Sequence, residues 1–453
     1  MISPPLRWSD LPGRRVGVWG VGAEGRATLR RLRSSALEPS AIVDDSPAQP
    51  WILATSAGGM DALARCDVVI KSPGISRHGG RVASLEARGV AVVGGIGLWL
   101  EEVGPANVIG ITGTKGKSTT TSVAGHLAAG FGRSCFVGGN LGAIPWDPES
   151  EEGNPAPAEP DLWIIEISSY QATDLWSSPA VVAVTSLHPD HLDWHGSVDA
   201  YYADKLSLCG RRGARITIAN GTDERLRRRA ASLAPGPRWI GTPDGGEWSE
   251  ALRTSEGLRW VESLGLRGRH NIINAMIAAA CLEEMGIPEA SDPDRLARAA
   301  AGFRPLPHRL ETVAVVEGVE YVDDSLSTNV LPTIAAAEVF AQRPLALIAG
   351  GFDRDIDYGP LAEHITRRKE ASLVLTVPDN GERIRHEVTL RGGNAVACQD
   401  VSHAVRIASR WAQPGTVVLL SPAAASYGRF ANYRHRGEAF RAAVDALGGK
   451  SER

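Results

Sequence analysis

The sequence predicts an α/β protein with three domains, each built around a mainly parallel sheet. Short apolar runs rich in β-branched residues recur along the 453-residue chain, and helix-compatible stretches separate them. Several of these runs end at glycine-rich turns, which is typical of strand-to-helix connections that bind nucleotides. A chain of this length exceeds a single hydrophobic core. We therefore expect domains at 1–104, 105–304 and 305–453.

The composition argues against a membrane-spanning or nucleic-acid-binding protein. Apolar residues make up 43% of the chain and charged residues 22%, which is typical of soluble globular proteins. The net charge of −4 gives no basic footprint for nucleic acid. No apolar run approaches the length of about 20 residues that spans a membrane. Residues 1–5 lack the pattern of a secretory signal.

The cysteines indicate the redox environment. There are five cysteines, an odd number, and they are widely spaced. They form no metal-binding spacing. This usage is typical of buried, reduced thiols. We therefore expect a cytoplasmic protein without membrane insertion or nucleic-acid partners.

The first domain combines predicted strands with a nucleotide-binding fingerprint. The strand at 15–19 runs into Gly20-Val21-Gly22-Ala23-Glu24-Gly25, and the strand at 41–43 ends at Asp44-Asp45. A third strand, at 66–70, is followed by Ser72-Pro73-Gly74. Gly-x-Gly-x-x-Gly after a first strand, with an acid after the second, sets backbone N–H groups and a helix N-terminus against a phosphate. This predicts a Rossmann-like domain for a nucleotide-like ligand such as NAD; glycines that serve only helix–sheet packing are the alternative.

The second domain is organised around the apolar run 108–112 and the loop that follows it. The loop reads Gly113-Thr114-Lys115-Gly116-Lys117-Ser118, and a helix-compatible stretch comes next. Strand, glycine loop and helix form a P-loop-type phosphate cradle, in which Lys117 neutralises phosphates and the Ser118 hydroxyl binds Mg²⁺. The spacing departs from the strict P-loop, which has four residues between its first glycine and Gly-Lys. A simple glycine turn between a core strand and a surface helix is the alternative.

Two further strands of the second domain, at 162–167 and 181–185, lead to residues that suit a metal ion. Glu166 lies at the end of the first strand and His191 just beyond the second. Mg²⁺ beside a triphosphate takes few protein ligands, mostly oxygen, and Ser118, Glu166 and His191 can supply them. Alone, such a glutamate is more often a cap or ion-pair partner, and such a histidine is more often structural. Their position after the glycine loop favours metal and phosphate chemistry.

The remaining segments complete the domain pattern. The Pro- and acid-rich segment 147–157 predicts an exposed loop, and 269–286 is expected to be helical. Strands of the third domain are expected at 345–349, 373–376, 395–397 and 417–420. Helical stretches separate these strands, which predicts a second Rossmann-like domain with ligands at the carboxyl ends of its strands.

Several short motifs occur in the order seen in the muramyl ligases, the ATP-dependent enzymes that build the peptidoglycan stem peptide. They are Gly113-x-x-Gly116-Lys117-Ser118, Gly139-Asn140-Leu141-Gly142, Glu166-Ile167-Ser168-Ser169, Asp190-His191-Leu192-Asp193, His270-Asn271-x-x-Asn274-Ala275 and Pro307-His308-Arg309-Leu310-Glu311. Asp324-Ser325 with Thr328-Asn329, and Ser421 to Ser426 with Arg436-Gly437, look like the glutamate-adding members. The chain therefore resembles this family over nearly its whole length.

The resemblance implies an amide-forming reaction. ATP converts the carboxylate of UDP-N-acetylmuramoyl-L-alanine into an acyl phosphate, which the amine of glutamate attacks, with catalysis by positioning and charge neutralisation. The implied cofactors are ATP and Mg²⁺. Closure of the third domain would complete the site and exclude water. We expect a monomer.

The resemblance also assigns residues to each ligand. Lys205 matches a lysine that CO₂ carbamylates in the family; without the resemblance, an exposed helix lysine paired with Asp204 is the simpler interpretation. The implied catalytic residues are Lys117, Glu166, His191 and Lys205, and the implied metal ligands are Ser118, Glu166, His191 and carbamylated Lys205. The implied ATP site is Gly113, Thr114, Lys115, Gly116, Lys117, Ser118, Thr119, Asn271, Arg309 and Asp324. The residues implied for the UDP-linked substrate are Gly22, Ala23, Glu24, Asp44, Asp45, Ser72, Pro73, Gly74, Asn140, Ser168 and Gln171.

The residues implied for glutamate depart from the usual family pattern. They are Thr328, Arg354, Ser426 and Tyr433. Arg354 stands in place of a lysine and Tyr433 in place of a phenylalanine, while Leu326 replaces another lysine and Gly428 an aspartate. Arginine clamps a carboxylate with two parallel hydrogen bonds, whereas lysine is a point charge. These changes favour the branch of the family that adds L-glutamate; neutral drift in a D-glutamate enzyme is the alternative.

Three more distant interpretations stay open on the sequence alone. A folylpolyglutamate synthase-like ligase would share the glycine loop but does not need the first domain. An NAD-dependent oxidoreductase with a fused nucleotide-binding module would be excluded by ATP-dependent phosphate release without a change in nicotinamide absorbance. A non-catalytic protein with the same fold is disfavoured by the intact Lys117, Glu166, His191 and Arg309.

Overall fold

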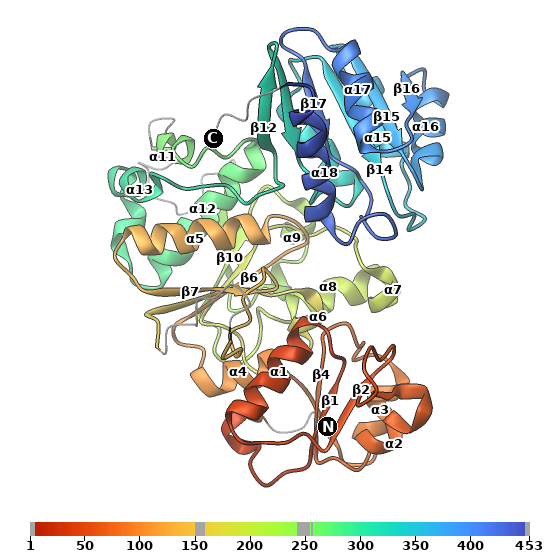
Figure 1. Ribbon diagram of the computed structural model, residues 1–453. Helices are drawn as coiled ribbons and strands as arrows, with labels where there is room; N and C mark the ends of the chain where they lie inside the picture. The colour runs from red at the N-terminus through yellow and green to blue at the C-terminus, as the bar shows by residue number, and fades with distance from the viewer. Residues whose placement is uncertain (1–4, 150–158, 242–253, 255–256, 449–453) are drawn as a thin grey trace. The chain divides into compact units, whose positions relative to one another are not determined.

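The computed structural model describes residues 5–149, 159–241, 254 and 257–448. In this part of the chain the strands form three sheets, with helices between most consecutive strands, which confirms the predicted α/β fold (Figure 1). The chain divides into two compact units. The first unit holds two of the sheets and consists of Met1–Leu264 and His270–Phe303. The second unit holds the third sheet and consists of Gly265–Arg269 and Arg304–Arg453.

The first sheet is parallel throughout and has the order β3-β2-β1-β4-β5. Its strands are β1 (Val16–Trp19), β2 (Ala41–Asp44), β3 (Leu53–Ala54), β4 (Val68–Lys71) and β5 (Ala91–Gly94). Its helical segments are η1 (Trp8–Asp10), α1 (Ala23–Ser34), η2 (Thr55–Gly59), α2 (Met60–Leu63), α3 (Gly80–Glu86) and α4 (Gly95–Val103). The strand order changes direction between β1 and β4, so the loops after these two strands flank the position where such sheets bind ligands.

The second sheet, also parallel, has the order β11-β10-β9-β6-β8-β7. Its strands are β6 (Val108–Thr112), β7 (Cys135–Gly139), β8 (Leu162–Glu166), β9 (Val181–Val184), β10 (Ile216–Asn220) and β11 (Pro237–Ile240). Its helical segments are α5 (Lys117–Gly130), α6 (Ser169–Ala172), α7 (Leu192–His195), α8 (Val198–Leu206), α9 (Glu224–Arg227), η3 (Ala230–Ser232), α11 (Arg259–Glu262), α12 (Arg269–Glu284), η4 (Pro288–Ser291) and α13 (Pro293–Ala300). β6 lies between β8 and β9, and Ile111 pairs with Glu166, so the end of β8 lies beside the glycine loop.

The third sheet has the order β12-β13-β17-β14-β15-β16 and is parallel except for the β12–β13 pair. Its strands are β12 (Glu311–Val316), β13 (Val319–Asp323), β14 (Leu345–Gly350), β15 (Ser372–Val377), β16 (Ala395–Ala397) and β17 (Val417–Leu420). Its helices are α14 (Val330–Val339), α15 (Gly359–Thr366), α16 (Gly381–Leu390), α17 (Val401–Trp411) and α18 (Tyr433–Asp445). The sequence predicts β14 to β17, and the β12–β13 hairpin is additional.

Aromatic contacts join the first and second sheets in one apolar core. Trp99 of α4 meets Trp163 of β8 edge-on, with ring centroids 5.2 Å apart, and Trp8 lies 6.4 Å from Trp146. Strands β6 and β9 are buried along their whole length. This is typical of parallel strands that are covered on both faces.

Two expectations change at the residue level. Asp147 is buried and forms an ion pair with Arg30, so the segment predicted as an exposed loop starts inside the structure. Positions 150–157 of that segment lie outside the described residues. All five cysteines are described and are free thiols, but Cys135 is only partly buried.

Among the described residues, no helix combines the length and the apolar character that crossing a membrane requires.

Candidate active site

The glycine loop has a backbone that its two glycines alone permit. Gly113 has a φ of 138° and Gly116 a φ of 91°. A Cβ at Gly113 would lie 2.1 Å from Thr185 Oγ1, and a Cβ at Gly116 would lie 2.5 Å from Asn274 Oδ1. Positive φ and close approach both select glycine. The loop therefore packs tightly against its neighbours before α5 begins.

The loop presents positive charge at the N-terminus of α5. Lys117 Nζ donates to the carbonyl oxygens of Gly113 at 3.0 Å and Thr114 at 3.2 Å. The backbone N–H of Lys115 donates to Ser186 Oγ at 2.8 Å, and Lys115 Nζ lies 3.4 Å from Asp190 Oδ2. The first turn of α5 carries no acidic residue. The backbone N–H groups and the helix dipole at such a terminus favour a phosphate.

Glu166 offers a carboxylate oxygen beside this loop. Its side chain is buried, and Oε1 accepts a hydrogen bond of 2.7 Å from Asn140 Nδ2. Its Oε2 is buried without a hydrogen-bond partner among the described residues. A buried anionic oxygen left unpaired is costly, so the site fits a cation.

Lys205 is buried on α8 rather than exposed. Its Nζ donates to the carbonyl oxygen of Gly113 at 3.0 Å. Burial, reinforced by the charges of Lys117 and Lys115, holds the pKa of Lys205 well below its usual value. Pairing with Asp204 is therefore wrong as an interpretation of this lysine. Burial at the loop therefore favours the uncharged form of this amine.

His191 lies at the start of α7 with a φ of 52° and a side chain that is 43% exposed. Its ring lies 5.2 Å from that of Tyr170. Partial burial lowers its pKa, so its nitrogen lone pair is available at neutral pH. The ligand set predicted for a metal thus combines the Ser118 hydroxyl, the Glu166 carboxylate and a neutral imidazole, all in the first unit.

Asn271 and Asn274 occupy one face of α12. Both are buried, and Asn274 Nδ2 donates to Asn271 Oδ1 at 3.1 Å. Asn274 is the side chain that a Cβ on Gly116 would strike. The structure thus adds Asn274 to the residues around the loop. Its signal in the sequence is the Asn-x-x-Asn spacing, which sets both amides on one helical face.

The residues predicted for the UDP-linked substrate surround the loops after β1, β2 and β4. Asp44 Oδ2 accepts a hydrogen bond from the Val21 N–H at 2.7 Å, and its Oδ1 accepts one from the Ser46 N–H at 2.9 Å. Asp45 instead forms an ion pair with Arg81 at 2.7 Å. Ser72 Oγ donates to the Gly20 carbonyl at 2.8 Å. These contacts stabilise the loops beside the position, between β1 and β4, where the strand order changes direction.

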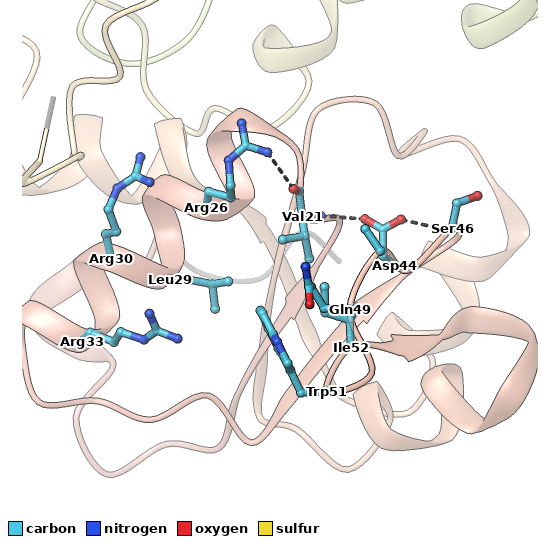
Figure 2. A pocket seen from close by; sticks show the side chains of 11 residues that line it. Val21, Arg26, Leu29, Arg30, Arg33, Asp44, Ser46, Gln49, Trp51 and Ile52 are labelled. Carbon is cyan, nitrogen blue, oxygen red and sulfur yellow. Dashed lines mark hydrogen bonds between the residues drawn. The ribbon is translucent and has the colours of Figure 1, made fainter. Parts of the chain in front are cut away.

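A pocket of about 470 Å³ opens beside these loops. Its lining residues are Val21, Arg26, Leu29, Arg30, Arg33, Asp44, Ser46, Ala48, Gln49, Trp51 and Ile52. Figure 2 shows the Trp51 indole along one wall and the Arg33 guanidinium pointing toward it from α1. Trp51 is 52% exposed. A flat aromatic surface with charged and amide groups around it suits a polar, planar ligand.

Four other predicted substrate residues form hydrogen bonds with protein groups. Gln171 Nε2 donates to Glu24 Oε1 at 2.7 Å, and Ser168 and Gln171 form a capping box at the start of α6. Burial raises the pKa of Glu24 to about 7, so its carboxyl group is partly protonated at neutral pH. Asn140 holds Glu166, as described above. These contacts join the first sheet to the end of β8.

In the second unit, two predicted ATP residues lie close together. Asp324 is buried, and its Oδ2 accepts a hydrogen bond of 2.7 Å from Ser421 Oγ. Burial raises its pKa to about 6, against the opposing effect of hydrogen bonds and the nearby charge of Arg309. His308 Nδ1 lies 2.7 Å from Asp323 Oδ2. The β13 end and the Pro307–Glu311 segment therefore form one polar cluster.

The residues predicted for glutamate are also in the second unit. Arg354 donates to the Thr328 carbonyl oxygen at 2.6 Å. Ser426 is buried, and the Tyr433 ring lies 5.9 Å from that of His308. Arg436, which the sequence analysis quoted without assigning a role, is buried and donates to the carbonyl oxygens of Ala424 and Ser325.

Comparisons with known proteins point to one family over nearly the whole chain. The Mur ligase middle domain matches residues 111–282, and the Mur ligase glutamate ligase domain matches residues 308–424. A UDP-N-acetylmuramoyl-L-alanine--L-glutamate ligase of Salinispora tropica is 40% identical, over 97% of this chain and 99% of that protein. The chain belongs to the Mur ligase family. A second protein of that name, from Xanthomonas euvesicatoria, is 36% identical to this Mur ligase over 96% of both chains.

The Mur ligase fold is also seen among solved structures. UDP-N-acetylmuramate-alanine ligase MurC of Thermotoga maritima has a TM-score of 0.58 at 16% identity, over 96% of this chain and all of that one. The family and the predicted enzyme class are therefore confirmed: this Mur ligase is an ATP-dependent amide-bond ligase. That result removes the oxidoreductase and the non-catalytic alternatives, and relatives that extend over the first sheet remove the folylpolyglutamate synthase-like one.

Proposed function

We propose that this Mur ligase adds L-glutamate to UDP-N-acetylmuramoyl-L-alanine, with ATP, in peptidoglycan precursor synthesis. The observation that carries the proposal is the arrangement at the glycine loop, where the buried carboxylate of Glu166 and the buried amine of Lys205 lie against a phosphate cradle. The substrates are those in the names of the relatives at 35–40% identity.

The reaction has two bond-forming steps. A carboxylate oxygen of the substrate attacks the γ-phosphorus of ATP; an O–P bond forms, the bond to the β-phosphate oxygen breaks, and ADP leaves. The glutamate nitrogen then attacks the acyl carbon of the acyl phosphate. A C–N bond forms, the C–O bond to phosphate breaks, and the nitrogen loses a proton. Lys117 and the N–H groups of α5 stabilise charge on the transferring phosphoryl group.

Mg²⁺ is the proposed metal. The unpaired Oε2 of Glu166 and the neutral imidazole of His191 fit such an ion, and Ser118 and carbamylated Lys205 would complete its protein ligands. When bound, the ion supplies charge neutralisation for the phosphates. Burial favours the uncharged form of the Lys205 amine, which attacks the carbon of CO₂. An N–C bond forms, one C–O π bond breaks as its electron pair moves to oxygen, and the nitrogen loses a proton, which leaves an anionic carbamate on the lysine.

We assign one ligand to each predicted domain. Residues 1–104 bind the uridine diphosphate, with the α1 N-terminus at the phosphates and the Trp51 pocket at the base. Residues 105–304 hold ATP through the glycine loop, with Thr119 and Asn271 nearby, and residues 305–453 add Arg309 and Asp324. Thr328, Arg354, Ser426 and Tyr433 bind glutamate. The enzyme is proposed to act as a monomer in the cytoplasm, where its free thiols stay reduced.

Steady-state assays with L- and D-glutamate test the proposed substrate. Purified enzyme with ATP, Mg²⁺ and UDP-N-acetylmuramoyl-L-alanine is expected to release phosphate faster with L-glutamate. Lys117→Ala serves as the inactive control, because it removes the cation at the loop. Faster turnover with D-glutamate would refute the stereochemical assignment and leave the ligase reaction standing. No turnover with either isomer would refute the proposed function.

A further inference from the structure

A second group of metal-ligand side chains lies outside the glycine loop, within the first unit. His78 follows β4, His195 ends α7, and Asp204 lies on α8. The Nε2 of His78 and the Nδ1 of His195 each lie 2.7 Å from Oδ2 of Asp204. None of the three residues has a role in the function proposed above.

We propose that His78, His195 and Asp204 bind a divalent transition-metal ion, such as Zn²⁺ or Co²⁺, with one coordination position left for water. The three ligand atoms all lie within 4.8 Å of one another. Two imidazole nitrogens and one carboxylate are a common ligand set for these ions, whereas Mg²⁺ prefers oxygen. The site is therefore chemically distinct from the one proposed for Mg²⁺.

The two nitrogen–oxygen distances, 2.7 Å each, are close to those of a tetrahedral site. With metal–ligand bonds of about 2.0 to 2.2 Å, tetrahedral ligand atoms lie about 3.3 Å apart. Each nitrogen would move away from Oδ2 by about 0.6 Å as an ion replaces the shared hydrogen bonds. His195 is fully buried, whereas the His78 side chain is 48% exposed. His78 can thus adjust and also leaves a path for the ion.

The ring nitrogen of His195 that points away from Asp204 has a hydrogen-bond partner, as is typical of a metal-bound histidine. Its Nε2 lies 3.0 Å from Ser169 Oγ. A histidine that binds metal through one nitrogen typically donates its other N–H to a neighbouring acceptor, which fixes the ring and its tautomer. The Ser169 hydroxyl, at the start of α6, can accept that hydrogen bond. Nδ1 is then directed at Asp204.

The same row of groups has the order of a serine-nucleophile triad, Ser169, His195 and Asp204. A catalytic triad is excluded because a substrate cannot reach the Ser169 hydroxyl. Ser169 is 3% exposed and His195 is 5% exposed, so no substrate reaches the hydroxyl. The row therefore orients an imidazole rather than activating a nucleophile.

Aromatic rings keep the two histidines in place. His195 stacks on Tyr170 with a centroid distance of 5.4 Å and lies 4.4 Å from Trp194. His78 also contacts Trp194, edge-on, with ring centroids 5.8 Å apart. Trp194 Nε1 donates to the Gly74 carbonyl oxygen at 3.0 Å, which ties α7 to the loop that carries His78. Little rearrangement is needed for the three ligands to meet one ion.

Titration with Co²⁺, whose visible absorption reports tetrahedral nitrogen and oxygen ligation, tests the site. The protein is tag-free, free of nucleotide, and carries Glu166→Ala, which removes a ligand of the proposed Mg²⁺ site. We expect one equivalent of Co²⁺ with a tetrahedral spectrum. Adding His78→Ala or Asp204→Asn should weaken binding at least about tenfold. His386→Ala, which changes an exposed histidine of the second unit, should leave binding unchanged.

The outcomes are distinguishable. Equal Co²⁺ affinity with and without His78→Ala would overturn the proposal, and so would loss of the tetrahedral spectrum in Glu166→Ala alone. Far-ultraviolet circular dichroism and a melting curve without metal verify that the variants fold. Zn²⁺ should raise the melting temperature of Glu166→Ala but not of Glu166→Ala/His78→Ala, because a ligand that binds only the folded state stabilises it. None of these measurements uses ATP or substrate, so they are independent of the proposed function.

Discussion

Single residues around the glycine loop carry the strongest chemical constraints. Glu166 has one carboxylate oxygen bound by Asn140 and the other buried and unpaired among the described residues. Lys205 is a buried amine, and burial lowers its pKa well below the usual value. Burial of the unpaired Glu166 oxygen and burial of the Lys205 amine both cost free energy in a protein that binds no ligand there. The sequence predicted both residues as functional, but only the structure shows their burial.

Glu166→Gln tests the charge of that carboxylate. Glutamine keeps an oxygen for Asn140 but removes the negative charge offered to a cation. We expect kcat to fall by about 10² to 10³, the effect of losing one electrostatic contact to the reacting groups. Melting temperature should stay equal or rise, because an unpaired buried charge is removed. Unchanged phosphate release in Glu166→Gln would contradict the role given to this residue.

Gly116→Ala tests the packing of the loop. The new Cβ would lie 2.5 Å from Asn274 Oδ1, at a φ of 91°. We expect ATP affinity, measured by isothermal titration calorimetry, to fall more than about tenfold as the loop is displaced. Gly132→Ala is the matched control: its φ is 74°, but nothing lies within 4 Å of the Cβ. It should lose about 1 kcal/mol of stability and keep its ATP affinity. Equal losses of affinity in both variants would contradict the packing argument.

Among the secondary-structure elements, the hydrophobic pattern of the sequence predicted the central strands. It did not predict strands such as β7 and β13, which contain paired glycines or charged residues. β6, β9 and β17 are uniformly buried, so they read as apolar runs. β7 ends in Gly138-Gly139, which resembles a turn, and β13 contains Glu320 and Asp323. The charges in β13 are accommodated by partners distant in sequence, which local patterns do not show.

Glu320 illustrates this point and gives a pH prediction. Burial alone would raise its pKa, but hydrogen bonds from Thr312, Arg343 and Arg267 lower it to about 2. A carboxyl group with a lowered pKa stabilises the fold above its ordinary pKa of 4.5 and loses that effect as pH falls toward 2.

Urea unfolding of Glu320→Gln measures the effect. The variant should be less stable than wild type at pH 7, and the difference should shrink between pH 4.5 and pH 2. Glu370→Gln, at an exposed position, should match wild type at every pH. A wild-type advantage that stays constant over that acid range would show that the ion pairs of Glu320 do not stabilise the fold.

At the scale of the molecule, buried polar contacts bind the first two sheets into one unit. Lys71 Nζ lies 2.7 Å from Asp174 Oδ2, and Arg77 Nε lies 2.9 Å from its Oδ1. Lys71 and Asp174 are 103 positions apart in the chain. The sequence predicted the α/β fold, but no local feature indicated this pair, because nothing local distinguishes a buried lysine from an exposed one.

Removing one partner of that pair should destabilise the first unit. Asp174→Asn leaves the buried Lys71 without a counter-charge, and we expect a loss of about 3 kcal/mol in urea unfolding. Lys71→Met/Asp174→Asn should recover at least half of the loss, because the fully buried charge of Lys71 is removed and Arg77 keeps its ion pair with Glu86. If the double variant is less stable than Asp174→Asn, the pair is not the source of the effect.

The central claim is that the carboxylate of the substrate is activated by ATP at the glycine loop. Supplying UDP-N-acetylmuramoyl-L-alanine with ¹⁸O in its terminal carboxylate, together with ATP and L-glutamate, tests it by mass spectrometry of the released phosphate. We expect one ¹⁸O in each phosphate formed, because the acyl C–O bond breaks after the O–P bond has formed. Phosphate without ¹⁸O, formed alongside the amide product, would contradict it.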